Sequence, residues 1–233
     1  MDDRYRIQTI ISFLNTTYGH LSWWDAPFDE VAIGAILTQQ TRWENVTLAL
    51  WQLHAAGLAT LSSIDAADPG EIEQCIRCTG FYRVKTSRLR RLAACILDNF
   101  GDRMRNKHLV DGRMTEEPIP DQSKDYLEQM SRIDTEELRR TLLMVNGVGE
   151  ETADSILCYG LFRPVCIIDA YTQRICECAG IRSDQKQLRQ LFLEELHHDN
   201  ALLRSFHGQI VEYGKAYCGK KRCSECMITA LNG

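Results

Sequence analysis

The segment from Val31 to Leu37 constrains the fold of this chain more than any other, because it is apolar on every side. A helix at the surface keeps one polar face, whereas a helix that is hydrophobic all round is buried among other elements. We therefore expect residues 31–37 to form a helix in the middle of a helical bundle. The segment is also far too short to span a bilayer.

Helical spacing of apolar residues continues along most of the chain. Further stripes follow a polar turn at residues 38–41, and they cover residues 43–53, 89–97, 188–196 and 202–210. No alternation with a period of two persists long enough to predict a strand, so the sequence predicts an all-α fold. Between Gly101 and Lys124 the pattern breaks down, and we expect a surface loop there.

Composition narrows the class of protein. The 233 residues include 27 Lys and Arg against 32 Asp and Glu, which gives a formal net charge of −5. Any surface that binds nucleic acid must therefore be local rather than a basic coat. The residues from Met1 to Arg4 lack the pattern of a secretory signal, so we expect a cytoplasmic protein without a membrane partner, whose 10 cysteines stay reduced.

Two glycines that bracket one apolar residue, Gly147-Val148-Gly149, follow a predicted helix and precede another. Such a turn leaves the N–H groups of the second helix directed outward, and glycine lets a phosphate oxygen approach them closely. A tight connection with a glycine cap needs only one glycine, so both interpretations remain open. Glu150 and Glu151 suit the helix dipole, but they oppose a phosphate unless their side chains turn away.

A single carboxylate, Asp169, stands where an apolar run from Pro164 to Ile168 meets the predicted start of another helix. An isolated aspartate at such a place is more commonly an N-cap, which accepts a backbone N–H two or three residues later. Capping also fixes the direction of the carboxylate. A role as cap and a role in catalysis are therefore compatible.

Together these segments resemble the helix–hairpin–helix DNA glycosylases of the endonuclease III superfamily. The likeness rests on Gly147-Val148-Gly149 followed by Ile168-Asp169, and it extends in order through residues 35–41, 80–85 and 206–208. Trp23-Trp24, the turn at residues 37–41 and the segment 207–213 look most like the 3-methyladenine DNA glycosylase branch. The resemblance implies two helical lobes with a DNA-binding cleft: a six-helix barrel with the hairpin over residues 28–162, and a lobe formed by residues 1–27 with 163–233.

The resemblance implies that Gly147, Val148 and Gly149 grip a phosphate and that Asp169 is the catalytic carboxylate. Asp169 would polarise the attacking water or stabilise positive charge on the sugar. Members that also cut the DNA backbone carry a lysine at the position of Glu151, and its amine forms a Schiff base with the sugar. Glutamate cannot do so, and we expect a monofunctional enzyme unless folding brings another lysine to the site.

The resemblance also assigns residues to the damaged base. Trp23, Trp24 and Trp43 would line its pocket, where stacking suits a cationic methylated purine; packing in the core is the alternative for each. Two consecutive tryptophans cannot both face inward on one helix stripe, which favours a loop for the first two. Gln39 and Gln40 would fill the space left by the flipped base, and a solvent-facing turn is the alternative.

Local basic charge favours DNA as the partner, although such runs are usually solvated helix faces. The segment from Phe81 to Arg91 contains the cations Arg83, Lys85, Arg88, Arg90 and Arg91 and no acid. The tail adds Lys215, Lys220, Lys221 and Arg222.

Three cysteines near the end of the chain, Cys218, Cys223 and Cys226, resemble a metal site. Many relatives bind a structural [4Fe–4S] cluster there through four cysteines. Here only the two-residue gap matches, and Asn232 stands where the fourth cysteine would be. A cluster would need a non-cysteine ligand or a distant cysteine; zinc with an added histidine and free thiols are the alternatives. The other seven cysteines show no comparable grouping and are interpreted as small apolar residues.

We therefore expect a monomeric DNA N-glycosylase that releases alkylated purines, 3-methyladenine above all, from damaged double-stranded DNA and needs no cofactor for its chemistry. One alternative is an endonuclease III-like glycosylase and lyase that acts on oxidised pyrimidines. The other is a non-catalytic helix–hairpin–helix DNA-binding protein, in which Asp169 is only a cap.

Overall fold

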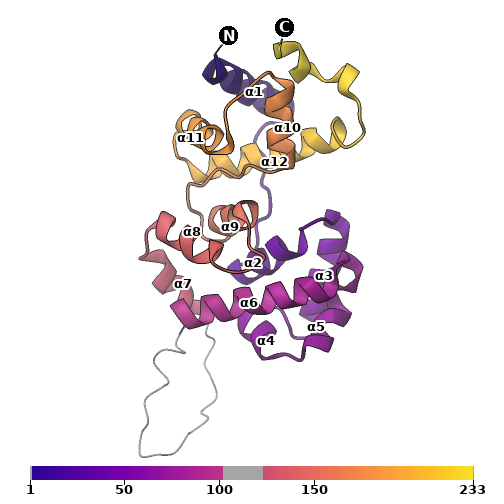
Figure 1. The fold of residues 1–233 in the computed structure, drawn as a ribbon, viewed down its shortest axis with the longest axis vertical. Coiled ribbons are helices and arrows are strands. Elements are labelled where there is room, and N and C mark those ends of the chain that lie inside the picture. The colour runs from indigo at the N-terminus through magenta and orange to yellow at the C-terminus, as the bar shows by residue number, and fades with distance from the viewer. Residues whose placement is uncertain (1, 102–122, 233) are drawn as a thin grey trace, which may run out of the picture. The chain divides into compact units, whose positions relative to one another are not determined.

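The computed structural model describes residues 2–101 and 123–232, and every regular element in this part of the chain is a helix (Figure 1). The prediction of an all-α fold is therefore confirmed. The loop expected between Gly101 and Lys124 lies almost wholly outside the described residues. None of the described helices combines the length with the apolar character that crossing a bilayer requires.

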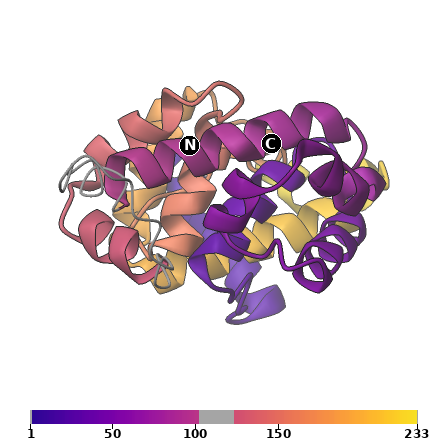
Figure 2. The same cartoon turned by 90° about the horizontal axis from the view of Figure 1, so that it is seen from below.

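The chain divides into two compact units, Ala26–Ile156 and Met1–Asp25 with Leu157–Gly233. The described helices of the unit Ala26–Ile156 are α2 (Phe28–Leu37), α3 (Trp43–Ala55), α4 (Leu61–Ala66), α5 (Pro69–Ile76), η1 (Arg77–Thr79), α6 (Tyr82–Phe100), α7 (Ser123–Ser131), α8 (Thr135–Leu143) and α9 (Glu150–Ser155). In both views α6 is the long magenta helix that runs across this unit (Figures 1 and 2).

Helix α2 is the centre of this unit. It contacts α3, α6 and α9, and Glu30 is the one exposed residue among its ten. The prediction of a buried helix at residues 31–37 is therefore confirmed. Burial of the Val, Ile and Leu side chains of such a helix stabilises the fold by about 1.5–3 kcal/mol each.

Lys85 of α6 fixes the end of this central helix. Its side chain is buried, and its ammonium donates hydrogen bonds to the carbonyl oxygens of Leu37 (2.9 Å) and Thr79 (3.0 Å). Leu37 is the last residue of α2, so the cation lies at the negative end of that helix dipole. Burial lowers the pKa of Lys85 to about 8. The inclusion of Lys85 among the cations available to phosphate was therefore wrong.

The helices of the other unit are α1 (Asp3–Tyr18), α10 (Ala170–Cys178), α11 (Gln185–Glu195), α12 (Asn200–Ala216), η4 (Cys223–Glu225) and η5 (Met227–Asn232), and a π-helical turn, η3 (Ile156–Gly160), begins at its boundary. Helix α12 packs against α1 and α10. Aspartates 169, 184 and 199 are the N-caps of α10, α11 and α12, and each accepts a backbone N–H.

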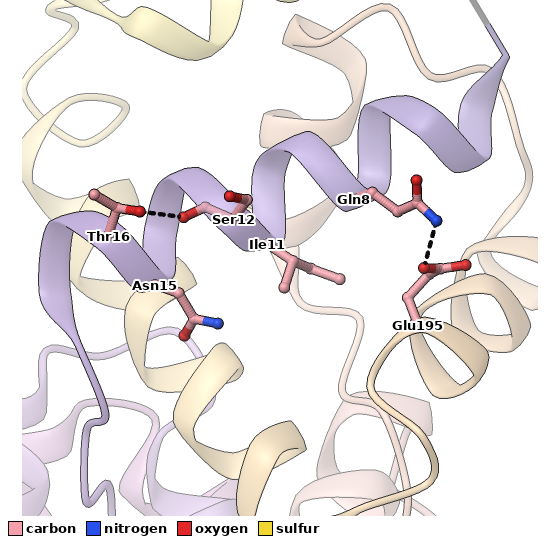
Figure 3. A pocket seen from close by; sticks show the side chains of 6 residues that line it. All are labelled: Gln8, Ile11, Ser12, Asn15, Thr16 and Glu195. Carbon is pink, nitrogen blue, oxygen red and sulfur yellow. Dashed lines mark hydrogen bonds between the residues drawn. The ribbon is translucent and has the colours of Figure 1, made fainter.

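A hollow of about 470 Å³ lies on the surface between α1 and the end of α11 (Figure 3). Polar side chains border it, and Gln8 Nε2 donates to Glu195 Oε2 across 2.8 Å. None of the residues that the sequence singled out lines this hollow. The hollow is therefore separate from the candidate site residues.

Candidate active site and nucleic-acid interface

The two glycines of the hairpin between α8 and α9 have different structural roles. Gly147 has a φ of +100°, and a Cβ built there would lie 2.4 Å from Cγ of Arg88. Gly149 is the N-cap of α9 and has an ordinary φ of −92°, and no atom lies within 4 Å of a Cβ built on it. Gly147 is therefore required by the backbone and by packing, whereas Gly149 keeps the space before α9 open.

A groove of about 590 Å³ runs along this hairpin. Its lining includes Gln39 and Gln40 from the turn after α2, Arg88 from α6, and the residues Gly147, Val148 and Gly149. The structure thus brings together two sets of residues that the sequence singled out separately, more than a hundred positions apart. Both sets belong to the unit Ala26–Ile156.

Gln39 and Gln40 differ in their freedom to reach a ligand. Gln39 Nε2 donates to the carbonyl oxygen of Gly147 and to Thr152 Oγ1, both at 3.0 Å, and Gln39 Oε1 accepts from Arg88. The amide of Gln39 therefore ties the turn to the hairpin. Gln40 is exposed and has a φ of +54°. Of the two, Gln40 is the side chain that is exposed.

The charges around the hairpin leave the start of α9 less acidic than the sequence suggests. Arg139 Nη2 lies 3.3 Å from Glu150 Oε2, and Arg139 Nε donates to Asp154 Oδ1 at 2.7 Å. Arg91 of α6 is exposed and donates to the Asn146 side chain at 3.2 Å. The negative charge of Glu150 is thus partly offset, and cations from α6 border the same hairpin.

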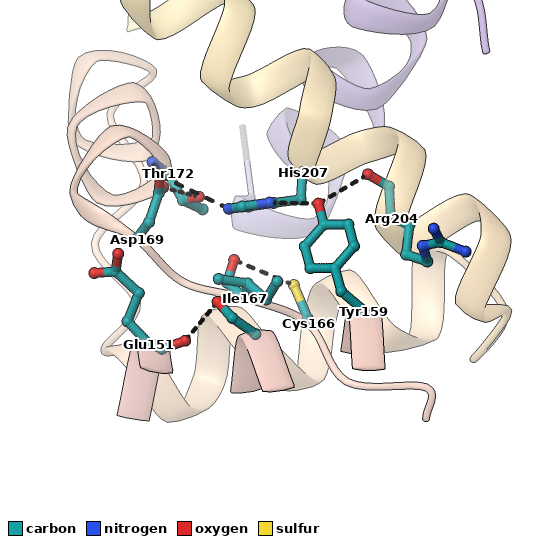
Figure 4. A network of polar contacts seen from close by, with 9 residues as sticks. Glu151, Tyr159, Cys166, Ile167, Asp169, Thr172, Arg204 and His207 are labelled. Atoms are coloured by element: carbon teal, nitrogen blue, oxygen red, sulfur yellow. Dashed lines mark hydrogen bonds and ion pairs between the residues drawn. The ribbon is translucent and has the colours of Figure 1, made fainter. Parts of the chain in front are cut away.

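Asp169, in the other unit, is both a cap and a directed carboxylate (Figure 4). Its Oδ1 accepts hydrogen bonds from the backbone N–H of Thr172 (2.7 Å) and from Thr172 Oγ1 (2.6 Å). Its Oδ2 accepts no hydrogen bond from the described residues and lies 3.8 Å from Nε2 of His207. Two donors fix one oxygen, so the other oxygen remains available to a reacting group.

His207 of α12 lies beside this carboxylate with its imidazole buried. Its Nδ1 is 2.7 Å from the hydroxyl of Tyr159, and burial lowers the pKa of His207 below its usual value of 6.5 although Asp169 opposes the shift. Burial also raises the pKa of Tyr159 well above 10, so the phenol keeps its proton. The same hydroxyl donates to the carbonyl oxygen of Arg204 at 3.4 Å, so Tyr159 joins the His207 imidazole to the backbone of α12, while Nε2 of His207 faces Asp169.

Asp169, His207 and Tyr159 form a network of contacts that continues from Tyr159 to Trp23 and Trp24. The ring of Trp24 lies against that of Tyr159, with 5.7 Å between centroids, and Arg204 lies over the same ring at 5.5 Å. Arg204 also donates to the carbonyl oxygens of Trp23 and Trp24, both at 3.4 Å. Trp24 is thereby linked to Asp169 through Tyr159 and His207.

Trp23 and Trp24 lie in an irregular segment between α1 and α2, as the sequence indicated, and both are half-buried. Lys215 Nζ is 4.8 Å from the centre of the Trp23 ring, which also packs against Gly208 of α12. Trp43 is half-buried at the start of α3, in the other unit. Its membership of a base pocket with the other two tryptophans stays a prediction.

Tyr159 and Arg204 belong to this network, but sequence reasoning missed them. Tyr159 lies outside the stripes that the sequence predicts, and Arg204 lies within the segment 202–210, which predicts ordinary packing. His207 was noted only as part of a resemblance, although a histidine on the otherwise apolar stripe of residues 202–210 was a signal. A buried histidine needs a polar partner, which the phenol of Tyr159 provides at Nδ1.

The three cysteines of the tail lie around one cavity of about 210 Å³. Cys178, at the end of α10, lines the same cavity, so the interpretation of the seven other cysteines as an ungrouped set was wrong for this residue. No three His, Cys, Asp or Glu side chains of the described residues converge closely enough to hold a metal ion.

The hairpin between α8 and α9 and the capped, buried carboxylate of Asp169 are the two features on which the sequence resembled helix–hairpin–helix DNA glycosylases. The match to a family model agrees: residues 33–197 match the HhH-GPD superfamily base excision DNA repair protein. The chain belongs to this superfamily of DNA glycosylases.

Two relatives and two solved structures illustrate the likeness. The chain is 34% identical to a candidate DNA repair glycosylase of Methanocaldococcus jannaschii over 229 residues, which cover 95% of this chain and 93% of that protein. It is 24% identical to endonuclease III of Thermotoga maritima, with coverage of 87% and 80%.

The fold is similar to that of H. pylori 3-methyladenine DNA glycosylase (MagIII) bound to 1,N6-ethenoadenine, with a TM-score of 0.69, 25% identity and coverage of 93% and 98%. A non-covalent endonuclease III–DNA complex has a TM-score of 0.71 at 17% identity, with coverage of 99% and 95%.

Proposed function

We propose that this protein hydrolyses the bond between a damaged base and its sugar in double-stranded DNA and that Asp169 is the catalytic carboxylate. The observation that carries the proposal is the asymmetric environment of this side chain: Thr172 fixes Oδ1, whereas Oδ2 has no hydrogen-bond donor among the described residues. A carboxylate with one oxygen fixed and one free can be held beside a sugar that gains positive charge.

The chemistry follows from that charge. As the bond from C1′ to the base nitrogen breaks, its electron pair leaves with the base and the sugar becomes oxocarbenium-like. The ionised Asp169 stabilises this sugar, and a water oxygen then bonds to C1′ and loses its proton to the carboxylate or to solvent. A methylated purine that carries a positive charge departs as a neutral base, so little acid catalysis is needed.

We further propose that the enzyme is monofunctional, because Glu151 stands where lyases of this superfamily have the lysine that forms a Schiff base. A carboxylate cannot attack C1′ and yield an imine, so water remains the nucleophile. The products are a free base and an abasic strand whose backbone is intact.

Alkylated purines are the proposed substrate class, with 3-methyladenine as the preferred base. The tryptophan pair supports this choice, because an electron-rich indole stacks well on a cationic base. Similarity to MagIII, a 3-methyladenine glycosylase, at 25% identity supports it as well. Trp24, which is linked to Asp169 through Tyr159 and His207, is the first candidate for the stacking residue.

The DNA strand itself is proposed to bind at the groove along the hairpin. The start of α9 after its cap Gly149, the space that this glycine keeps open and the exposed cations of α6 suit a phosphate. Gln40 is the proposed wedge that fills the stack when a base is flipped, because the amide of Gln39 is already committed to the hairpin.

The test is incubation of the purified protein with methylated duplex DNA, followed by chromatography of the released bases and electrophoresis of the DNA before and after alkali. We expect 3-methyladenine among the free bases, strand breaks only after alkali and no adduct trapped by borohydride. A trapped adduct together with release of oxidised pyrimidines would instead establish the endonuclease III-like alternative. Intact DNA binding without release of any base would establish the non-catalytic alternative.

A further inference from the structure

A cavity in the unit Met1–Asp25 with Leu157–Gly233 brings four cysteines together: Cys178, Cys218, Cys223 and Cys226. We propose that these four thiolates hold a [4Fe–4S] cluster and that Cys178 is the fourth ligand, replacing the tail cysteine that this chain lacks. The assignment concerns a residue forty positions before Cys218, outside any linear cysteine motif.

The fold explains how this residue reaches the tail. Cys178 is the last residue of α10, and α10 packs against both α12 and η5. Cys218 follows the end of α12, while Cys223 begins η4 and Cys226 follows it. The short tail helices therefore fold back over the end of α10, and the cavity of about 210 Å³ lies between these elements.

The donor set fits an iron–sulfur cluster better than a single ion. Four cysteine thiolates are the usual complete ligand set of a [4Fe–4S] cluster, whereas three are not. A tetrahedral zinc needs all four sulfurs about 2.3 Å from one point, whereas a [4Fe–4S] cluster binds each thiolate at a different corner. Four cysteines that line one cavity of about 210 Å³ suit the larger group.

Charge and hydrogen bonding at the cavity fit the same occupant. Arg174 and Lys221 line it, and their positive charges would offset the net negative charge of a cluster with four thiolates. The hydroxyl of Tyr213 lies 3.1 Å from Sγ of Cys226, and such contacts to ligand sulfurs tune a cluster. Assembly requires iron and inorganic sulfide from outside the chain, and the four thiols lose their protons to solvent as they bind.

The placement also indicates what the cluster does. Helix α10 begins after its cap, Asp169, and ends at Cys178, so a cluster bound by Cys178 anchors the far end of the helix that positions this carboxylate. The role is structural and requires no change of oxidation state. It does not depend on which base the enzyme releases.

The test compares iron, sulfide and stability in wild-type protein, Cys178→Ser and a matched control, Cys75→Ser, all purified without oxygen and reconstituted with iron and sulfide. Cys75 is also a half-buried helix cysteine, but it lies on α5 in the other unit. We expect about four iron and four sulfide per chain, with brown colour, in the wild type and the control. Cys178→Ser should lose most of this iron to a mild chelator and melt at a lower temperature.

Thiol mapping provides a second measurement that needs no variant to fold. In the loaded wild type, the four cysteines of the cavity should resist alkylation, and after removal of iron all four should be labelled, as mass spectrometry of the peptides reports. Wild-type iron content in Cys178→Ser, or alkylation of Cys178 while iron remains bound, would overturn the assignment. One zinc per chain, or no bound iron after reconstitution, would overturn it as well.

Discussion

The two hairpin glycines allow the phosphate site to be tested apart from the stability of the fold. In Gly147→Ala, the new Cβ meets Arg88 at 2.4 Å and the backbone keeps a φ of +100°. An alanine in the left-handed backbone conformation costs about 1–2 kcal/mol of stability. Displacement of Arg88 also breaks its charged hydrogen bond to Gln39, at about 1.5–3 kcal/mol. We expect this variant to lose about 2.5–5 kcal/mol of unfolding free energy.

Gly149→Ala should behave in the opposite way. Its φ of −92° suits alanine and its Cβ meets no atom within 4 Å, so stability should be unchanged or rise by about 0.4–1 kcal/mol. The added methyl group would occupy the open space before α9, where a phosphate is proposed to bind. We expect the Kd for duplex DNA to rise about tenfold, which corresponds to about 1.4 kcal/mol.

Urea unfolding followed by circular dichroism measures the first effect, and fluorescence anisotropy with a duplex that contains an abasic-site analogue measures the second. Wild-type DNA affinity in Gly149→Ala would refute the phosphate role of the hairpin. Wild-type stability in Gly147→Ala would refute the packing argument.

Two further predictions concern the turn after α2 and the buried imidazole. Gln39→Ala should destabilise the protein by about 2–4 kcal/mol in urea unfolding, because the hydrogen bonds to the hairpin are lost. Gln40→Ala should change stability by less than about 1 kcal/mol. It should nevertheless slow base release from duplex DNA more than from single-stranded DNA. Equal effects of the two variants would contradict the assignment of Gln40 as wedge. Because burial lowers the pKa of His207 from its usual 6.5, the folded protein binds fewer protons than the unfolded chain just below that pH. The contribution of His207 to wild-type stability should therefore fall as the pH drops below 6.5 and stay constant above that pH. The difference in unfolding free energy between the wild type and His207→Gln should change between pH 7.5 and pH 5, and a constant difference would contradict the argument.

Sequence patterns predicted the elements whose local chemistry is self-sufficient. The apolar run 31–37 must be buried whatever surrounds it, and it forms the core of α2. Asp169 lies where an N-cap is expected and accepts the backbone N–H of Thr172. The glycine pair does separate two helices, although only the structure distinguishes the strained Gly147 from the unhindered Gly149.

Features that depend on long-range packing could not be predicted in the same way. Lys85 belongs to a basic run, and only the approach of α2 shows that its ammonium is buried against the carbonyl of Leu37. Tyr159 lies forty-eight positions from His207, so no spacing rule joins them. Cys178 was set aside because its partners lie in a tail that folds back over α10.

The rate of base release by Asp169→Asn tests the central claim most directly. Asparagine is as good an N-cap as aspartate, so the substitution removes the charge and keeps the cap. Asp184→Asn, at the cap of α11, is the matched control. We expect single-turnover release of 3-methyladenine from methylated duplex to fall by about 10²–10³-fold or more in Asp169→Asn, with DNA affinity and melting temperature retained, and to be unchanged in Asp184→Asn. Release at the wild-type rate by Asp169→Asn would show that Asp169 only caps the helix and would contradict the proposed mechanism.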